Sequence, residues 1–247
     1  MQELFRQARR SRLIIYDPAE GLLLPESVKR SHRPITKAER RHILAVAQTH
    51  PAGLWVLTIL YTGLRPGETA ALFWEDIDFD RNEIHVYKAV ESGTRTIKAP
   101  KTPAGIRDIP MRQELRERLL AVRGEGAAPV FPSANGGIRR AHSPRRPWNS
   151  FAHALDLHMG AKVRDGQILQ HAIAPDLTPY CLRHTFCTDL QRAGVPINEA
   201  KELMGHANIS VTANIYTHRD QKVLHNNMAK LNPKGRRAVG KTQEKTV

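Results

Sequence analysis

Apolar residues recur at helical spacing along most of this chain, and local start and stop signals divide the pattern into separate helices. The clearest start is a capping box, in which the side chains of Thr36 and Glu39 each accept a hydrogen bond from the other's backbone amide. Gly63 ends the next helix and Pro66 fits the first turn of the one after it, so Arg65 is expected at a helix–helix junction. The predicted helices cover residues 3–13, 36–50, 51–62, 66–72, 113–122, 148–158, 178–191, 196–203 and 208–216.

Alternation of apolar and polar residues replaces the helical pattern in the middle of the chain, and this predicts strands. The alternating segments are 84–86, 95–98 and 106–111, with turn residues between them at 92–93 and 103–105. We therefore expect a mainly α-helical protein of the α+β class with one small three-stranded antiparallel β-sheet. Residues 143–147 hold too many proline and arginine breaks for a helix, and residues 160–174 are expected to form a loop.

The two ends of the chain differ from its middle. Residues 1–34 contain one predicted helix and a proline-punctuated linker, with too few apolar residues for a core of their own. Residues 35–220 hold nearly all the periodic segments and are expected to form the main domain. Residues 221–247 combine a small apolar set, which fits one side of a short helix, with a final basic stretch that is expected to be disordered.

Composition adds a strong positive charge to this picture. The 247 residues carry a formal net charge of +14 and a pI near 10.2, which favours a polyanionic partner, most simply nucleic acid. Charge alone is also compatible with a basic protein that has another role. No apolar run approaches the roughly eighteen residues that a membrane-spanning helix needs, and the first residues do not form a secretory signal. Cys181 and Cys187 are expected to be reduced thiols of a cytoplasmic protein.

A small group of residues has the chemistry for attack of a phenol on a phosphodiester. Arg65 and Arg183 each offer a planar fork that matches two phosphate oxygens. Arg183 stands in an otherwise apolar helix, where an unpartnered charge is costly. His206 follows Gly205 at a predicted helix end, and Tyr216 lies ten residues further on. Because a protonated tyrosine is a weak nucleophile, it requires cations and hydrogen-bond donors around the phosphate.

The motifs around these residues read GLRPGE at 63–68, LRH at 182–184, LMGH at 203–206 and IYTH at 215–218. With them the chain resembles the catalytic domain of a tyrosine recombinase of the phage integrase family, similar to the integrases of prophages and conjugative transposons. The resemblance covers roughly residues 35–220. It implies that Tyr216 is the nucleophile and that Glu68 orients an arginine or a histidine. The residues that it implies around the scissile phosphate are Arg65, Arg183 and His206.

A lysine and a tyrosine are the remaining candidate site residues. The resemblance implies a general-acid lysine in a β-turn, which favours Lys101, while Lys98 on the same hairpin is the competing candidate. Tyr180 occupies the place where the family pattern HxLRH has a histidine. It shares a helix face with Arg183 and can donate a hydrogen bond to phosphate, but a phenol is a poor base at neutral pH. His184 lies one position further round the helix and is expected to be structural.

The function that the resemblance implies is site-specific DNA recombination or integration through a covalent 3′-phosphotyrosyl intermediate. No cofactor is expected, and no metal either, since the histidines form no convincing ligand set and arginines neutralise the phosphate. The expected partner is double-stranded DNA with recombination sites. The protein is expected to be a monomer that forms a homotetramer on DNA, with accessory DNA-bending proteins as further candidates and no membrane association.

Three points stay open at this level. The resemblance implies an N-terminal DNA-binding domain ahead of residues 1–34 that is missing or truncated, in a cytoplasmic protein encoded by a bacterium or a phage. The tail helix either docks on a neighbouring protomer or packs on its own domain. The alternatives to recombination are DNA relaxation like that of a type IB topoisomerase and DNA binding without catalysis.

Overall fold

The structure is a computed structural model that describes residues 2–21, 32–91, 94–139, 145–216 and 228. The chain forms two compact units, Met1–Ser31 and His32–Val247. The first unit contains α1 (Gln2–Arg10), which ends three residues before the predicted boundary at residue 13. The predicted turn at 92–93 and, apart from Met228, the predicted tail helix lie outside the described residues.

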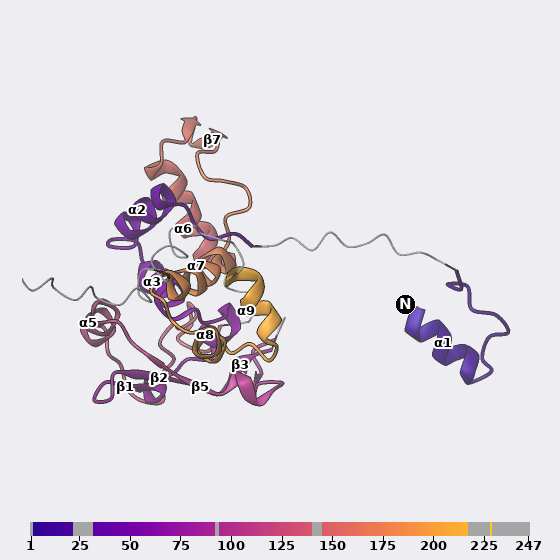
Figure 1. The fold of residues 1–247 in the computed structure, drawn as a ribbon. Coiled ribbons are helices and arrows are strands. Elements are labelled where there is room, and N and C mark those ends of the chain that lie inside the picture. Colours follow the sequence, from indigo (N-terminus) through magenta and orange to yellow (C-terminus); the bar gives the residue numbers. More distant parts are fainter. Residues whose placement is uncertain (1, 22–31, 92–93, 140–144, 217–227, 229–247) are drawn as a thin grey trace, which may run out of the picture. The chain divides into compact units, whose positions relative to one another are not determined.

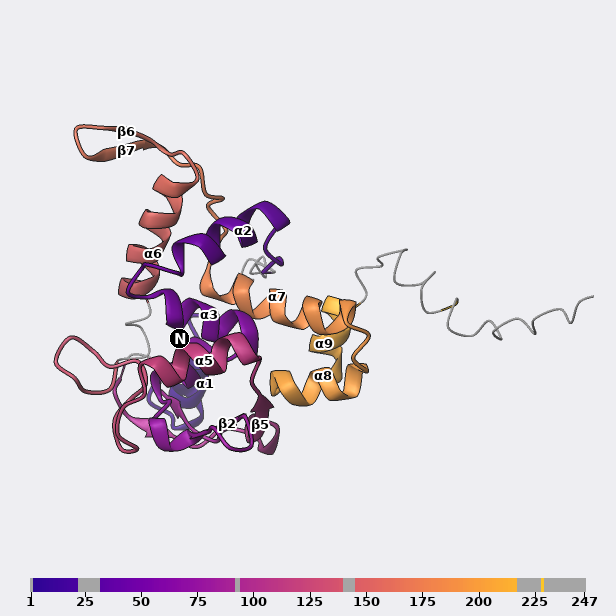
Figure 2. The same cartoon turned by 90° about the vertical axis from the view of Figure 1, so that its left-hand side faces the viewer.

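The second unit gathers its helices around α3, and Figures 1 and 2 show α7 running beside α3 with the small sheet on one side of both. Its helices are α2 (Lys37–Val46), α3 (Gly53–Thr62), α4 (Pro66–Ala70), α5 (Gln113–Ala121), α6 (Arg145–His158), α7 (Pro179–Arg192), α8 (Ile197–Met204) and α9 (Ile209–Tyr216). The helices predicted between residues 36 and 216 are thus confirmed, with shifted ends. The predicted capping box at Thr36 is also present, with Thr36 Oγ1 accepting from the Glu39 amide at 3.1 Å.

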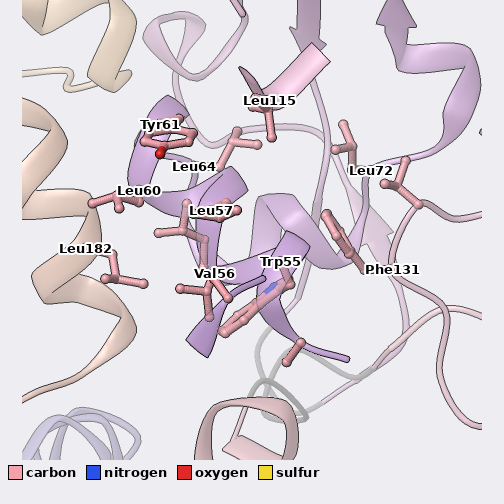
Figure 3. Packing of buried hydrophobic residues seen from close by; sticks show 14 of the residues in the cluster. Trp55, Val56, Leu57, Leu60, Tyr61, Leu64, Leu72, Leu115, Phe131 and Leu182 are labelled. Atoms are coloured by element: carbon pink, nitrogen blue, oxygen red, sulfur yellow. The ribbon is translucent and has the colours of Figure 1, made fainter. Parts of the chain in front are cut away.

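α3 is buried on all sides, because its sequence GLWVLTILYT is apolar at almost every position. Figure 3 shows its side chains between Leu115 of α5 and Leu182 of α7. Trp55 satisfies its indole N–H by donating to the Thr69 hydroxyl at 3.0 Å. The central helix therefore connects the N-terminal and C-terminal halves of the unit through one continuous core.

The three-stranded sheet has a different membership from the predicted one. Its strands run antiparallel in the order β1 (Ile77–Asp78), β2 (Glu83–Val86) and β5 (Arg107–Pro110). The expectation that residues 95–98 belong to this sheet is wrong, because β4 (Ile97–Lys98) pairs with β3 (Ala89–Val90) in a separate two-stranded sheet. Alternation reports which face of a strand is buried but not which strand it pairs with, and β1 reaches β2 through a shorter loop.

Two further segments differ from expectation. α6 begins at Arg145, so residues 145–147 are helical after all. Pro147 is tolerated because the first amides of a helix have no partner within it. The expected loop contains a hairpin of β6 (Lys162–Arg164) and β7 (Gln167–Gln170). Its two-residue turn is Asp165–Gly166, both with positive φ, and this dipeptide is the hairpin signal that the sequence interpretation missed.

Replacement of Leu57 by alanine tests whether α3 is the centre of the core. Leu57 is fully buried, so the cavity left in Leu57→Ala should lower the free energy of unfolding by about 3 kcal/mol. Urea titration should show a lower midpoint with an unchanged slope. Leu169→Ala is the matched control, because Leu169 on β7 is 66% exposed and its loss should change stability by less than about 0.5 kcal/mol. Equal losses in the two variants would contradict the assignment of α3 as the core.

Candidate active site

The site is built where the C-terminal ends of α3 and α8 meet the buried side of α7. Gly63 and Gly205 end these two helices with left-handed φ values of 65° and 63°. Arg183 reaches across from α7 and is only 5% exposed. Its guanidinium donates to the Gly63 carbonyl and, at 2.5 Å, to the Met204 carbonyl. The side chain therefore binds both helix ends through carbonyl groups that have no partner within their own helices.

Arg65 is held at the helix junction that the sequence predicts. Its Nη1 lies 2.6 Å from Glu68 Oε1, and its Nη2 donates to the Gly205 carbonyl at 2.8 Å. The backbone amide of Arg65 also donates to Glu68 Oε2 at 2.8 Å. The side chain is 37% exposed, in contrast to that of Arg183. Arg65 is thus oriented by protein contacts while part of it stays accessible to a ligand.

Arg107 of β5 is a member of the site that the sequence interpretation missed. It is 8% exposed and pairs with Glu68, with Nη2 at 2.9 Å from Oε2. Its Nε donates to the Leu203 carbonyl at 2.8 Å. The available signal was its place in the alternating strand, because Arg107 shares the buried face of β5 with Ile109. A cation at an inward position of a strand requires an anion, and Glu68 is that anion.

Glu68 is the single carboxylate among these three arginines. Burial alone would raise the pKa of Glu68, but Arg107, Arg65 and Arg183 outweigh burial and lower it to about 2. Burial, followed by the neighbouring Arg65, lowers the pKa of Arg183 to about 9, which still leaves the guanidinium charged at neutral pH. The cluster therefore carries more positive than negative charge, and it is suited to an anion.

His206 adds a neutral hydrogen-bonding group. It is 9% exposed, and its Nδ1 lies 2.9 Å from the hydroxyl of the buried Thr212 on α9. Burial and then the nearby Arg183 lower the pKa of His206 to about 3, so the imidazole is uncharged at neutral pH. When the Thr212 hydroxyl donates to Nδ1, Nε2 carries the proton and can donate to a bound anion.

A cavity of about 480 Å³ brings most of the sequence-predicted residues together. Its lining consists of His32, Arg65, Tyr180, Arg183, His184, Met204, His206, Ala207, Asn208, Val211 and Ile215. Tyr180 is 45% exposed and lines the cavity together with Arg183, in agreement with the helix face that the two residues are expected to share. His32 was assigned to the linker by the sequence interpretation, and nothing local in its sequence indicates that it reaches this cavity.

Tyr216, like Lys101 and Glu68, is a predicted site residue that does not line the cavity. It is the last residue of α9, and its hydroxyl donates to the Val195 carbonyl at 3.2 Å. Gln191 Nε2 donates to its backbone carbonyl at 2.6 Å. Burial, followed by Cys187 and Glu199, raises the pKa of Tyr216 to about 12. The hydroxyl is therefore protonated and bonded outside the cavity.

The two candidate lysines lie on the hairpin beside this site. Lys98 on β4 forms an ion pair with Glu91 at 2.6 Å. Lys101 is exposed at the following turn and makes no ion pair with any of the described residues. The turn continues into a short 3-10 helix, Pro103–Gly105, that packs against Gly205: a Cβ on Gly205 would lie 3.1 Å from the Ala104 carbonyl oxygen. Lys101 therefore lies directly before a segment that contacts the site, and no acidic side chain among the described residues pairs with its ammonium group.

In the described part of the chain, histidine, cysteine, aspartate and glutamate side chains form no group of three or more that could hold a metal ion. Among the described residues, no helix has both the length and the apolar composition to cross a membrane.

Comparison with known proteins places these features in a family. Residues 33–222 match the sequence model of the Phage integrase family. A XerC-like tyrosine recombinase from Caldanaerobacter subterraneus subsp. tengcongensis is 29% identical over 204 residues, which is 78% of this chain and 52% of that protein. The transposase of transposon Tn916 from Enterococcus faecalis is 30% identical over 166 residues, 66% of this chain and 41% of that protein. The chain thus spans about half the length of the curated relatives that it matches.

Solved structures give the same picture. The integrase of transposon Tn1549, in complex with circular intermediate DNA, has a TM-score of 0.69 at 26% identity, over 93% of this chain and 76% of that chain. A lambda integrase dimer bound to a COC′ core site has a TM-score of 0.58 at 17% identity, over 89% of this chain and 57% of that chain, and it shows the fold alone. The expected mainly helical fold with small antiparallel sheets is confirmed.

Replacement of Glu68 by glutamine tests the charge balance of the site. The pKa of Glu68 falls from an ordinary 4.5 to about 2, so its ionisation stabilises the fold above pH 4.5 and that contribution is lost as the pH falls towards 2. Between about pH 5 and pH 2.5 the wild type should lose about 2 kcal/mol more stability than Glu68→Gln, measured by urea titration at each pH.

The matched control is Glu117→Gln, because Glu117 is exposed on α5 and its replacement should leave the wild-type pH dependence in place. Glu68→Gln should also be less stable than the wild type at neutral pH by about 3 kcal/mol, because Arg107 keeps a buried charge without its partner. A Glu68→Gln variant with the wild-type pH dependence would contradict the assignment of Glu68 as the ionised centre.

Proposed function

The chain belongs to the phage integrase family, and on this premise we propose that it is a site-specific recombinase that cuts and rejoins DNA through a covalent 3′-phosphotyrosyl intermediate. One observation carries the proposal: Arg65, Arg183 and His206 line a single cavity with an excess of positive charge. A scissile phosphate is an anion of suitable size and hydrogen-bonding capacity for this cavity. Double-stranded DNA is the corresponding partner, in agreement with the net charge of +14.

The cavity residues would act on the phosphate through fixed donors. Arg65 keeps part of its fork exposed, and the contacts of both arginines with helix-end carbonyls fix their guanidinium groups. Nε2–H of neutral His206 supplies a further donor. Charge develops on the non-bridging oxygens in the transition state, and donors held in place before the reaction stabilise that charge without reorganisation.

The reaction has two steps, and each step forms one bond to phosphorus and breaks another. The Tyr216 oxygen forms a bond to phosphorus and gives its proton to a base, while the bond from phosphorus to the 5′ oxygen breaks. Lys101 donates a proton to the departing 5′ oxygen. In the second half, the 5′ hydroxyl of another strand attacks the phosphotyrosine and releases Tyr216. The phosphodiester bond energy is kept in the protein–DNA bond, so strand joining requires no nucleotide cofactor.

Tyr216 has to leave the Val195 carbonyl before it can react. That contact is a single hydrogen bond between uncharged groups, which contributes about 1 kcal/mol. Val211 and Ile215 of the same helix already line the cavity, so a modest movement of α9 would bring its last residue towards the phosphate. We propose that DNA binding promotes this movement. We also propose that the protein is a monomer without DNA and a homotetramer on DNA, and that accessory DNA-bending proteins take part in the reaction.

Recombination is preferred over DNA relaxation for one reason. Both reactions use the same phosphotyrosine chemistry, but the similar proteins are recombinases, transposases and integrases. The intact set of Arg65, Lys101, Arg183, His206 and Tyr216 favours catalysis over DNA binding alone.

Tyr216→Phe tests the nucleophile. The capture substrate is a nicked duplex, taken from oligonucleotides that tile the DNA flanking the gene, which loses a short strand when it is cut. The variant should form no covalent complex on a denaturing gel, while its DNA affinity should stay within about twofold, because one hydroxyl and no cation is removed. Tyr16→Phe is the control, since Tyr16 is 72% exposed and lies in the first unit. Covalent complex formed by Tyr216→Phe would refute the assignment.

A substrate with a changed leaving group can show which of Lys101 and Lys98 is the general acid. On an ordinary phosphodiester, Lys101→Ala should capture DNA about a hundredfold more slowly, whereas Lys98→Ala should stay close to the wild type because Lys98 pairs with Glu91. A substrate with sulfur in place of the 5′ bridging oxygen needs no proton on its leaving group, so it should restore the rate of Lys101→Ala. If sulfur restores Lys98→Ala instead, Lys98 is the general acid.

A further inference from the structure

A short segment ahead of α2 is fixed across the start of α7. Arg33 donates to Glu39 at 2.6 and 2.8 Å and to Asp176 at 2.8 Å. The amide of Ile35 donates to the Thr185 hydroxyl at 2.9 Å, and the Ile35 side chain is buried. We call residues 32–36 the strap. The contacts of Arg33 and Ile35 give the strap a defined path over α7.

His32, the first residue of the strap, lies on the cavity. Its ring stacks on that of Tyr180 with centroids 5.0 Å apart and an angle of 15° between the planes. Its Nδ1 lies 3.4 Å from the Thr178 hydroxyl, and among the described residues no hydrogen bond reaches its Nε2. Both rings line the cavity together with Arg65, Arg183 and His206. An exposed imidazole therefore borders the proposed phosphate site, with the ring of Tyr180 stacked against it.

Attack by a phenol requires a group that accepts its proton, and most cavity residues are unsuited to this. Guanidinium groups have no free lone pair to offer, and a phenol such as Tyr180 is a weak base. His206 is too weak a base, because its surroundings lower its pKa to about 3. His184 lines the cavity, but its Nδ1 is buried. His32 is the exposed imidazole of the lining.

We propose that His32 is the proton acceptor for Tyr216, with Tyr180 as the platform that holds its ring. The inference rests on the proposed function. As the Tyr216 oxygen bonds to phosphorus, its proton passes to His32 Nε2, and the bond to the 5′ oxygen breaks with a proton from Lys101. In the rejoining step, the attacking 5′ hydroxyl gives its proton back to Lys101, and His32 returns its proton to the Tyr216 oxygen as that oxygen leaves phosphorus. Protons, bonds and charges balance over the two steps without a further reactant.

The test measures the rate of covalent capture by His32→Ala on the nicked duplex described above. We expect a rate about a hundredfold below the wild type, with DNA affinity unchanged within about twofold. The bridging-sulfur substrate should leave this defect in place, because sulfur relieves the leaving group and not the nucleophile. His32→Gln, which keeps a polar side chain but cannot accept the proton, should behave like His32→Ala. His153→Ala is the matched control, since His153 is an exposed histidine on α6.

The pH profile gives a second readout. The charged or titratable groups around His32 are Arg33, Arg65, Asp176, Tyr180, Arg183, His184 and His206. Because a general base takes the Tyr216 proton, the capture rate of the wild type should rise with pH, and His32→Ala should lose that rise. An equal rise in His32→Ala would mean that another group accepts the proton, and it would overturn the inference.

Recovery of the capture rate in a double variant is the most direct test of the inference. Tyr180 stacks on His32 and lines the same cavity, so a histidine at position 180 should restore an imidazole close to the lost one. The double variant His32→Ala, Tyr180→His should capture DNA at least about tenfold faster than His32→Ala. Wild-type capture with an undiminished rate in His32→Ala would overturn this inference alone. A wild-type chain that captures no DNA would overturn the proposed function, and this inference with it.

Discussion

An imbalance of buried charge dominates this structure: three guanidinium groups surround one carboxylate. Glu68 pairs directly with Arg65 and Arg107, while Arg183 is bound by backbone carbonyls at the ends of α3 and α8. Helix C-termini carry partial negative charge, so the ends of α3 and α8 offset part of the positive charge of the guanidinium groups, as a second carboxylate would. The arrangement holds the cations in place without neutralising them, which leaves the cavity with an attraction for phosphate.

The same contacts explain why the fold and the site depend on each other. Arg107 belongs to the sheet, Arg65 follows the central helix and Arg183 lies on α7. All three nevertheless donate hydrogen bonds to backbone carbonyls at the end of α8, between Leu203 and Gly205. Glycine suits this position because its φ is 63°, and a Cβ there would lie 2.8 Å from Arg107 Nη1, so that Arg107 would have to shift. The LMGH motif is therefore a packing requirement as much as a source of the imidazole.

Sequence reasoning located what is encoded locally. Capping residues and prolines indicated the helices, and short motifs identified Arg65, Arg183 and His206, which the structure brings together in one cavity. It missed Arg107 because a lone arginine in a strand has no motif, and its meaning depends on Glu68 almost forty residues away. It assigned His32 to a linker because the stack on Tyr180 is a tertiary contact. The position of the Tyr216 hydroxyl depends on the Val195 carbonyl, which no local pattern indicates.

The sequence separation of these contacts has a consequence for synthesis of the protein. Arg183 binds Gly63 across 120 residues, and Arg65 binds Gly205 across 140. During translation, the central helix and the sheet leave the ribosome long before α7 and α8, so the cation cluster lacks Arg183 and the carbonyl groups of Met204 and Gly205 until the chain beyond His206 emerges. A nascent chain that ends before α8 therefore presents charged segments without the assembled cation cluster, which forms only after residues 203–206 have been made.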